Sequence, residues 1–272
     1  MLGAIVGDVV GSPFEFDRKR EIAHSKKFPL VPKEAYATDD TVMTLAVADA
    51  VMKTFPKKGA PADDGEFRAN VIKSMQSWGK KYPSAGYGVR FYGWLYDSNP
   101  KPYGSWGNGS AMRVSPVAWA LESLWEVEHF AGITAEVSHN HPEGLKGAQA
   151  TAGAIFLART GHSKAEIKTY IATRYGYDLN RTLDEIRPEY YHVESCQETV
   201  PEAVIAFLEG RDFEDVVRCA VSLSGDSDTL TAIAASIAEG FYGIPDEISD
   251  MVMPKLDGDL TDLLLKWELW RR

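Results

Sequence analysis

Two short clusters of carboxylate and hydroxyl residues each precede an apolar segment with helical spacing. They are Thr38, Asp39 and Asp40 in "YATDDTVMTLAVADAV", and Asp226, Asp228 and Thr229 in "SLSGDSDTLTAIAASIAEG". One side-chain oxygen is enough to cap a helix N-terminus, and one further carboxylate can favour the helix dipole. Consecutive residues on a regular helix point about 100° apart, but in the turn before a helix they can converge. Each cluster therefore holds more oxygen ligands than capping requires.

If the two clusters face each other, four carboxylates share one pocket. Two like charges about 4 Å apart repel by roughly 4 kcal/mol at an effective dielectric of 20, so such a pocket requires cations. Oxygen ligands without a nearby His/Cys set favour Mg²⁺, Mn²⁺ or Ca²⁺ over Zn²⁺. Two divalent ions would balance the four aspartates, and Glu15 in "GSPFEF" is a candidate fifth carboxylate.

A glycine-rich segment, "YGSWGNGSAMRVSP" at residues 103–116, has the composition of an anion-binding loop. Glycines let backbone N–H groups approach an anion closely, and Ser, Asn and Trp side chains could bind a phosphate or stack on a base. The lysine of a nucleoside-triphosphate loop is absent, which argues against that class. The alternative is a polar turn that leads into a helix near Ala111.

The segment "SHNHPEGLKGAQATAGAIF" contains His139 and His141 at a spacing that also occurs in zinc-dependent isopeptidase-like proteins. That zinc site needs a serine and an aspartate shortly downstream, and the next aspartate here is Asp178. We therefore reject a zinc site. Pro142 suits the first turn of a helix, and His139 in the preceding turn is either a ligand contact or a structural histidine.

The elements that must position these residues are almost all helices. Apolar spacing predicts helices after Asp40 and Thr229 and over residues 64–79, 143–159, 163–173, 200–209, 212–222 and 259–270, with stops at Gly161 and Gly210. Gly3, Gly7 and Gly11 form a smooth stripe for close helix packing rather than a dinucleotide loop, because G-x-G-x-x-G is absent. Segments 18–37 and 81–105 are expected to be ordered loops.

Composition excludes several classes of protein. The chain has 272 residues, of which 44% are hydrophobic and 25% charged, and it shows no linker or repeat, so we expect one domain over residues 1–272. A formal charge of −10 argues against broad nucleic-acid binding. Only two cysteines, no basic leader and no run of roughly 18 apolar residues predict a cytoplasmic protein without a membrane segment.

Taken in order, "GAIVGDVVGSPFE", "TDDT", "GSWGNGSAMR", "SHNHPEGLKGAQA" and "SGDSDT" resemble the motifs of the ADP-ribosylglycohydrolase family. The resemblance spans residues 3–229. It implies an all-α, compact orthogonal multi-helix fold with a two-magnesium centre, in which Mn²⁺ could substitute. It also implies hydrolysis of the glycosidic bond that joins ADP-ribose to an acceptor.

The resemblance assigns roles to individual residues. The implied metal ligands are Thr38, Asp39, Asp40, Asp226, Asp228 and Thr229, with Glu15 beside them. The implied ADP-ribose contacts are Gly104, Ser105, Trp106, Gly107, Asn108, Gly109 and His139. Glu15, Asp39 and Asp40 are the candidates for proton transfer, and the resemblance does not choose among them. Ser227 replaces a common threonine, and Ser105 stands where some arginine-directed members carry an acidic residue, which weakens an expectation of arginine specificity.

Four functions remain open from the sequence. The leading one is removal of ADP-ribose from a modified protein. All six metal-ligand positions hold competent residues, which favours an active hydrolase over a silent binding module. The others are hydrolysis of a small ADP-ribosyl compound, a catalytically silent ADP-ribose-binding module, and a structural protein. Crowded carboxylates make the last one costly.

Overall fold

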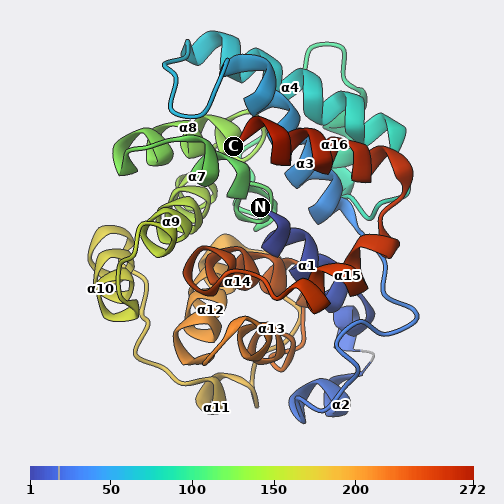
Figure 1. Cartoon of the computed structure of the whole chain (residues 1–272), viewed down its shortest axis with the longest axis vertical. Helices are drawn as coiled ribbons and strands as arrows, with labels where there is room; N and C mark the ends of the chain where they lie inside the picture. The colour runs from blue at the N-terminus through green and yellow to red at the C-terminus, as the bar shows by residue number, and fades with distance from the viewer. Residues whose placement is uncertain (18) are drawn as a thin grey trace.

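The computed structural model describes residues 1–17 and 19–272, and Figure 1 shows a bundle of helices that cross at steep angles. The described residues contain no strand, so the all-α prediction is confirmed. The helices are α1 (Leu2–Gly11), α2 (Arg20–His24), α3 (Asp39–Thr54), α4 (Asp64–Lys81), α5 (Val89–Tyr96), α6 (Gly109–Met112), α7 (Ser115–Ala120), α8 (Leu124–Glu136), α9 (Pro142–Arg159), α10 (Lys164–Tyr175), α11 (Leu183–Ile186), α12 (Cys196–Glu209), α13 (Phe213–Val221), α14 (Ser227–Tyr242), α15 (Asp246–Val252) and α16 (Gly258–Trp270). Two 3₁₀ turns, Ser12–Asp17 and Met253–Lys255, complete the order.

Helix α14 lies at the centre of the molecule, where it contacts α1, α9, α12 and α13 (Figure 1). Its residues are almost all buried, because apolar or small side chains occupy every face between Leu230 and Ala238. A helix that is apolar all round requires burial on all sides. This central position fixes the N-terminus of α14, which carries the second acidic cluster.

Helix α1 packs directly on α14 through the predicted glycine stripe. A Cβ atom on Gly7 would lie 2.5 Å from the backbone nitrogen of Ala232, and one on Gly11 would lie 2.6 Å from Cα of Asp228. Real Cβ atoms do not approach other atoms so closely, so only glycine permits this contact. Helix α1 also contacts α3, which carries the first acidic cluster. The stripe therefore holds the two clusters at a fixed separation.

The predicted helices are present, with ends that move by a few residues. The largest shift is at α12, which begins at Cys196 rather than at residue 200 and contains Pro201. Helix α9 ends just before Gly161, whose φ of 87° is left-handed, and α12 ends just before Gly210, whose φ of −63° is not. Helices α8, α11 and α15 were not predicted.

The expectation of a loop over residues 81–105 was wrong in part, because α5 lies within it. Phe91, Trp94 and Leu95 bury one face of this helix. Its length of eight residues and Gly93 within it obscured the helical period in the sequence. Segment 18–37 likewise contains the short helix α2, and residue 18 lies outside the described residues.

Within residues 1–17 and 19–272, none of the helices combines the length and the apolar character that crossing a membrane requires.

Candidate active site

The N-terminus of α3 is fixed by a buried carboxylate on α1. Thr38 caps the helix, because its Oγ1 accepts a hydrogen bond from the backbone N–H of Asp40 at 3.2 Å. The backbone N–H and Oγ1 of Thr38 both donate to Asp8, at 2.9 and 2.7 Å. The backbone N–H and Oγ1 of Thr41 donate to the same carboxylate. Capping is therefore complete without Asp39 and Asp40.

The N-terminus of α14 is built differently. Asp226 occupies the N-cap position, but its side chain makes no capping hydrogen bond. Instead, Oδ2 of Asp226 accepts a hydrogen bond of 2.6 Å from the side-chain amide of Asn108. Asp226, the expected capping residue of this cluster, therefore does not cap α14, because its carboxylate accepts from Asn108 in the glycine-rich segment and from none of the helix N–H groups.

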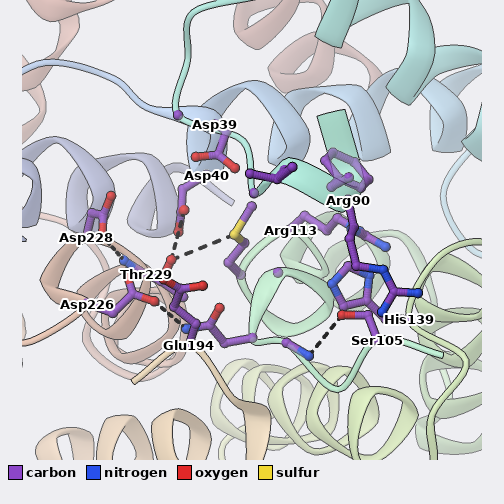
Figure 2. Close-up of a pocket in the computed structure, with 18 of the residues that line it drawn as sticks. Asp39, Asp40, Arg90, Ser105, Arg113, His139, Glu194, Asp226, Asp228 and Thr229 are labelled. Atoms are coloured by element: carbon purple, nitrogen blue, oxygen red, sulfur yellow. Dashed lines mark hydrogen bonds between the residues drawn. The ribbon is translucent and has the colours of Figure 1, made fainter. Parts of the chain in front are cut away.

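The two clusters meet across the central cavity. Oγ1 of Thr229 on α14 donates to Oδ2 of Asp40 on α3 at 3.0 Å, and Figure 2 shows this contact beside Asp226 and Asp228. One carboxylate oxygen each from Glu15, Asp226 and Asp228 lies within 4.8 Å of the others. The structure thus brings the predicted clusters and Glu15 into one group, although they lie far apart in the sequence.

The electrostatics of this group favour a cation. Burial, and then the charge of Asp228, raise the pKa values of Asp39, Asp40 and Asp226 well above the ordinary range. Burial also raises the pKa of Asp228. Oδ1 of Asp40 is buried without a hydrogen-bond partner. Crowded, desolvated carboxylates with a spare ligand oxygen fit a hard divalent cation. The residues present therefore fit the metal site that the sequence predicts.

These raised pKa values predict that the metal-free protein loses stability as pH rises and that Mg²⁺ stabilises the protein more at high pH. A carboxyl group with a higher pKa in the folded state binds more protons there than in the unfolded state, so stability falls as pH rises from about 4 toward the folded pKa. In EDTA we expect a lower Tm at pH 8 than at pH 6, and a larger rise on adding Mg²⁺ at pH 8. Thermal unfolding at both pH values measures this, and an equal Mg²⁺ effect at both would contradict it.

The carboxylates form one end of a cavity of about 380 Å³. At the other end are two arginines and a histidine, which Figure 2 shows on the opposite side of the cavity. Arg113 is buried and donates to the backbone oxygen of Thr134 and to Oγ of Ser138, both at 2.9 Å. Arg90 donates to the backbone oxygen of Tyr103 at 2.8 Å. The cavity is therefore acidic at one end and cationic at the other.

His139 lies between these groups in a fixed orientation. Its Nδ1 lies 2.8 Å from Oγ of Ser138, and burial together with the charge of Arg113 lowers its pKa well below the ordinary value. The imidazole is therefore neutral at physiological pH. A neutral histidine at this position can accept or donate a hydrogen bond to a ligand, but it does not act as a fixed cation.

The glycine-rich segment lies between the two ends of the cavity. Ser105, Gly107, Asn108 and Gly109 line the cavity, whereas Gly104 and Trp106 do not. Trp106 is 51% exposed, with its ring 5.7 Å from that of His141. Thr38 also does not line the cavity. The roles of these residues as metal or ADP-ribose contacts stay predictions.

Sequence reasoning missed five residues that shape the site. They are Asp8, Arg90, Arg113, His192 and Glu194; all but Asp8 line the cavity. A signal was available for Asp8, which is an acidic residue within the apolar glycine-striped segment and therefore requires buried partners. Arg113 lies inside the glycine-rich segment 103–116, but it was given no role there. His192 and Glu194 lie in a segment without a recognisable pattern.

Replacing Asp8 by Ala is expected to destabilise the protein by about 2 kcal/mol and to weaken Mg²⁺ binding at least about 10-fold, because it leaves buried N–H and hydroxyl groups of Thr38 and Thr41 without partners. Thermal unfolding and calorimetric titration with Mg²⁺ measure both effects. Asp8→Asn keeps an oxygen acceptor for the two N–H groups, so it should bind Mg²⁺ more tightly than Asp8→Ala. Equal Mg²⁺ affinity in wild type and Asp8→Ala would refute this role.

The family profile described as ADP-ribosylglycohydrolase matches residues 1–270. The chain belongs to the ADP-ribosylglycohydrolase family. It is 25% identical to ADP-ribosylhydrolase ARH3 of Homo sapiens, over 97% of this chain and 90% of that protein. It is 28% identical to ADP-ribosyl-[dinitrogen reductase] glycohydrolase of Rhodospirillum rubrum, over 94% and 88%.

Two further similarities agree with this family. ADP-ribosylarginine hydrolase Tri1 of Pseudomonas putida (strain GB-1) is 26% identical, over 90% of this chain and 70% of that protein. A solved structure described as an ADP-ribosylglycohydrolase-related protein complex superposes with a TM-score of 0.72 at 23% identity and covers 100% of this chain and 96% of that one. The latter supports the fold that the family resemblance implied. This member of the ADP-ribosylglycohydrolase family thus has the family's helical fold, with a cavity that is acidic at one end.

Proposed function

We propose that this family member is a Mg²⁺-dependent hydrolase that cleaves the glycosidic bond between ADP-ribose and a side chain of a modified protein. The observation that carries the proposal is the polarity of one cavity. Its acidic end holds Asp40, Asp226 and Asp228, and its other end holds Arg90 and Arg113. A ligand with a diphosphate at one end and a ribose at the other matches this distribution of charge.

In this proposal the diphosphate binds along the glycine-rich segment. Backbone N–H groups near Gly107 and Gly109, with the guanidinium of Arg113, provide donors for phosphate oxygens. The neutral imidazole of His139 lies beside Gly109, since a Cβ there would be 3.3 Å from Nε2. The distal ribose then reaches the carboxylates, which places its C1″ atom next to them.

The carboxylates and Thr229 would hold two divalent ions. Such ions, when bound, polarise ribose oxygens and lower the pKa of a coordinated water. The remaining task for the chain is proton transfer as the glycosidic bond breaks with oxocarbenium character. Glu15, Asp39 and Asp40 are the candidates, and all three line the cavity.

The test is release of ADP-ribose from four substrates: arginine-, serine- and nucleic-acid-linked ADP-ribose, and O-acetyl-ADP-ribose. We expect hydrolysis of at least one protein-linked substrate with Mg²⁺ and none with EDTA. Hydrolysis of O-acetyl-ADP-ribose alone would indicate a small-metabolite enzyme. Inactivity on all four, with retained ADP-ribose binding, would indicate a silent binding module.

A further inference from the structure

The segment between α11 and α12 separates the active-site cavity from a second cavity of about 400 Å³. We call residues 190–194 of this segment the strap. His192 and Glu194 of the strap line the active-site cavity, whereas Tyr191 and Val193 line the second cavity. Alternate residues of an extended chain point to opposite sides. The two cavities are therefore neighbours that share a wall one chain thick.

The strap is held in place by backbone contacts along its length. The guanidinium of Arg20 donates to the backbone oxygen of Tyr190 at 2.8 Å. The backbone N–H of Asn108 donates to the backbone oxygen of Glu194 at 2.8 Å. A Cβ on Gly225, the residue before Asp226, would lie 2.7 Å from the backbone oxygen of Tyr191. The wall between the cavities is thus fixed to the loops that carry the active site.

The second cavity is strongly acidic. Its lining contains four glutamates and a single arginine, which are Glu185, Glu189, Glu198, Glu202 and Arg181. The rings of Tyr190 and Tyr191 lie in the same lining, and Tyr191 is 60% exposed. Carboxylates beside the exposed ring of Tyr191 form a suitable environment for a guanidinium or an ammonium group.

The buried side chain of Glu202 is separate evidence that this cavity binds a cationic group. This side chain is only 4% exposed, yet it lines the cavity. Its Oε1 lies 2.8 Å from Nη1 of Arg181, whereas its Oε2 has no hydrogen-bond partner. A buried carboxylate oxygen without a donor is unfavourable by roughly 1–3 kcal/mol or more. A cationic group bound in the cavity would compensate the negative charge of this occluded carboxylate.

We propose that the second cavity binds a basic side chain of the acceptor protein while the modified residue occupies the active site. This inference rests on the proposed function and makes the acceptor a protein rather than a small compound. A wall one extended chain thick, with side chains on both faces, is on the order of 10 Å across. An extended peptide advances about 3.3–3.6 Å per residue, so a chain that crosses the strap reaches the second cavity about two to four residues from the modified one. The site therefore selects acceptors with Arg or Lys at that spacing.

The experiment uses pairs of ADP-ribosylated peptides, one pair linked through arginine and one through serine. Within each pair, the residues two to four positions from the modification are either arginine or glutamine. We expect kcat/KM to be about 10-fold higher for the basic peptide at low salt and this advantage to decline in high salt. ADP-ribosyl-arginine without a peptide serves as the small substrate.

Two variants remove charge from the cavity without touching the active site. Glu202→Gln tests the buried oxygen, and the exposed Glu189→Gln tests the same cavity without a risk to folding. Both should reduce the basic-peptide advantage toward 1 and leave hydrolysis of ADP-ribosyl-arginine unchanged. Glu247→Gln, an exposed change on α15, is the matched control and should retain the full advantage.

A binding arm separates this inference from the proposed function. Fluorescence anisotropy measures the affinity of unmodified basic and neutral peptides for the enzyme loaded with ADP-ribose. Suppose that no substrate is hydrolysed, but that the enzyme binds the basic peptide more tightly and Glu202→Gln removes this preference. The second cavity is then confirmed as a site for basic side chains, and the proposed function fails. Equal rates and equal affinities for basic and neutral peptides, or a preference that survives both Glu variants, would overturn the inference.

Discussion

Asp228→Asn is expected to reduce kcat for ADP-ribose release at least about 10³-fold, which corresponds to roughly 4 kcal/mol in the barrier. The replacement is isosteric and leaves an amide oxygen at the N-terminus of α14. It removes one negative charge from the buried carboxylate group, in which Asp228 raises the pKa values of Asp39, Asp40 and Asp226. Loss of this charge weakens the attraction for divalent cations and misplaces the ribose that depends on them.

Steady-state kinetics with Mg²⁺ and calorimetric Mg²⁺ titration measure this loss, and a retained helical circular dichroism spectrum establishes that the fold persists. Asp63→Asn is the matched control. Asp63 caps α4, where its Oδ1 accepts from the backbone N–H of Glu66 at 2.8 Å, and asparagine caps equally well. Full activity in Asp228→Asn would refute the metal site.

Gly7→Ala is expected to destabilise the protein by about 3 kcal/mol, since overpacking typically costs 1–3 kcal/mol and occasionally more. The new methyl group would meet the backbone of α14, with the nitrogen of Ala232 only 2.5 Å away. Backbone atoms of a central helix cannot move aside as a flexible side chain does. Because α1 also carries Asp8, separation of α1 from α14 should lower Mg²⁺ affinity as well as Tm.

Thermal unfolding should show a fall in Tm of roughly 5–10 °C for Gly7→Ala. Gly93→Ala on α5 provides the comparison, because a Cβ there would meet no atom within 4 Å. That exposed change should raise stability by up to about 1 kcal/mol through helix propensity. A Tm for Gly7→Ala at or above that of wild type would show that α1 and α14 do not need this close approach.

Part of the site could be predicted because its signal is local. Two carboxylates and a hydroxyl before an apolar helix exceed what capping uses, and the structure gives the reason: Thr38 caps α3 alone, and Asp226 does not cap α14 at all. The glycine stripe could also be recognised from the sequence, since small residues four positions apart lie on one helix face. Such patterns depend on neighbours in the chain, which the sequence displays directly.

Other features depend on residues that are distant in the sequence. Asp8 receives its donors from Thr38 and Thr41, some thirty positions away. Arg113 becomes part of the cavity because α6 packs on α9 and α14, and no local pattern records that contact. Trp106 is 51% exposed and does not line the cavity, and its stacking role stays a prediction.

The sequence by itself determined the helical class, the two acidic clusters and the family, because periodicity, composition and short motifs are properties of adjacent residues. The tertiary structure decided that the clusters form one buried group with Glu15, that arginines occupy the other end of the cavity, and that a second acidic cavity adjoins the strap. The physical reason is range: capping and amphipathicity act within a few residues, whereas Coulomb repulsion and burial depend on distances that only the packed helices set.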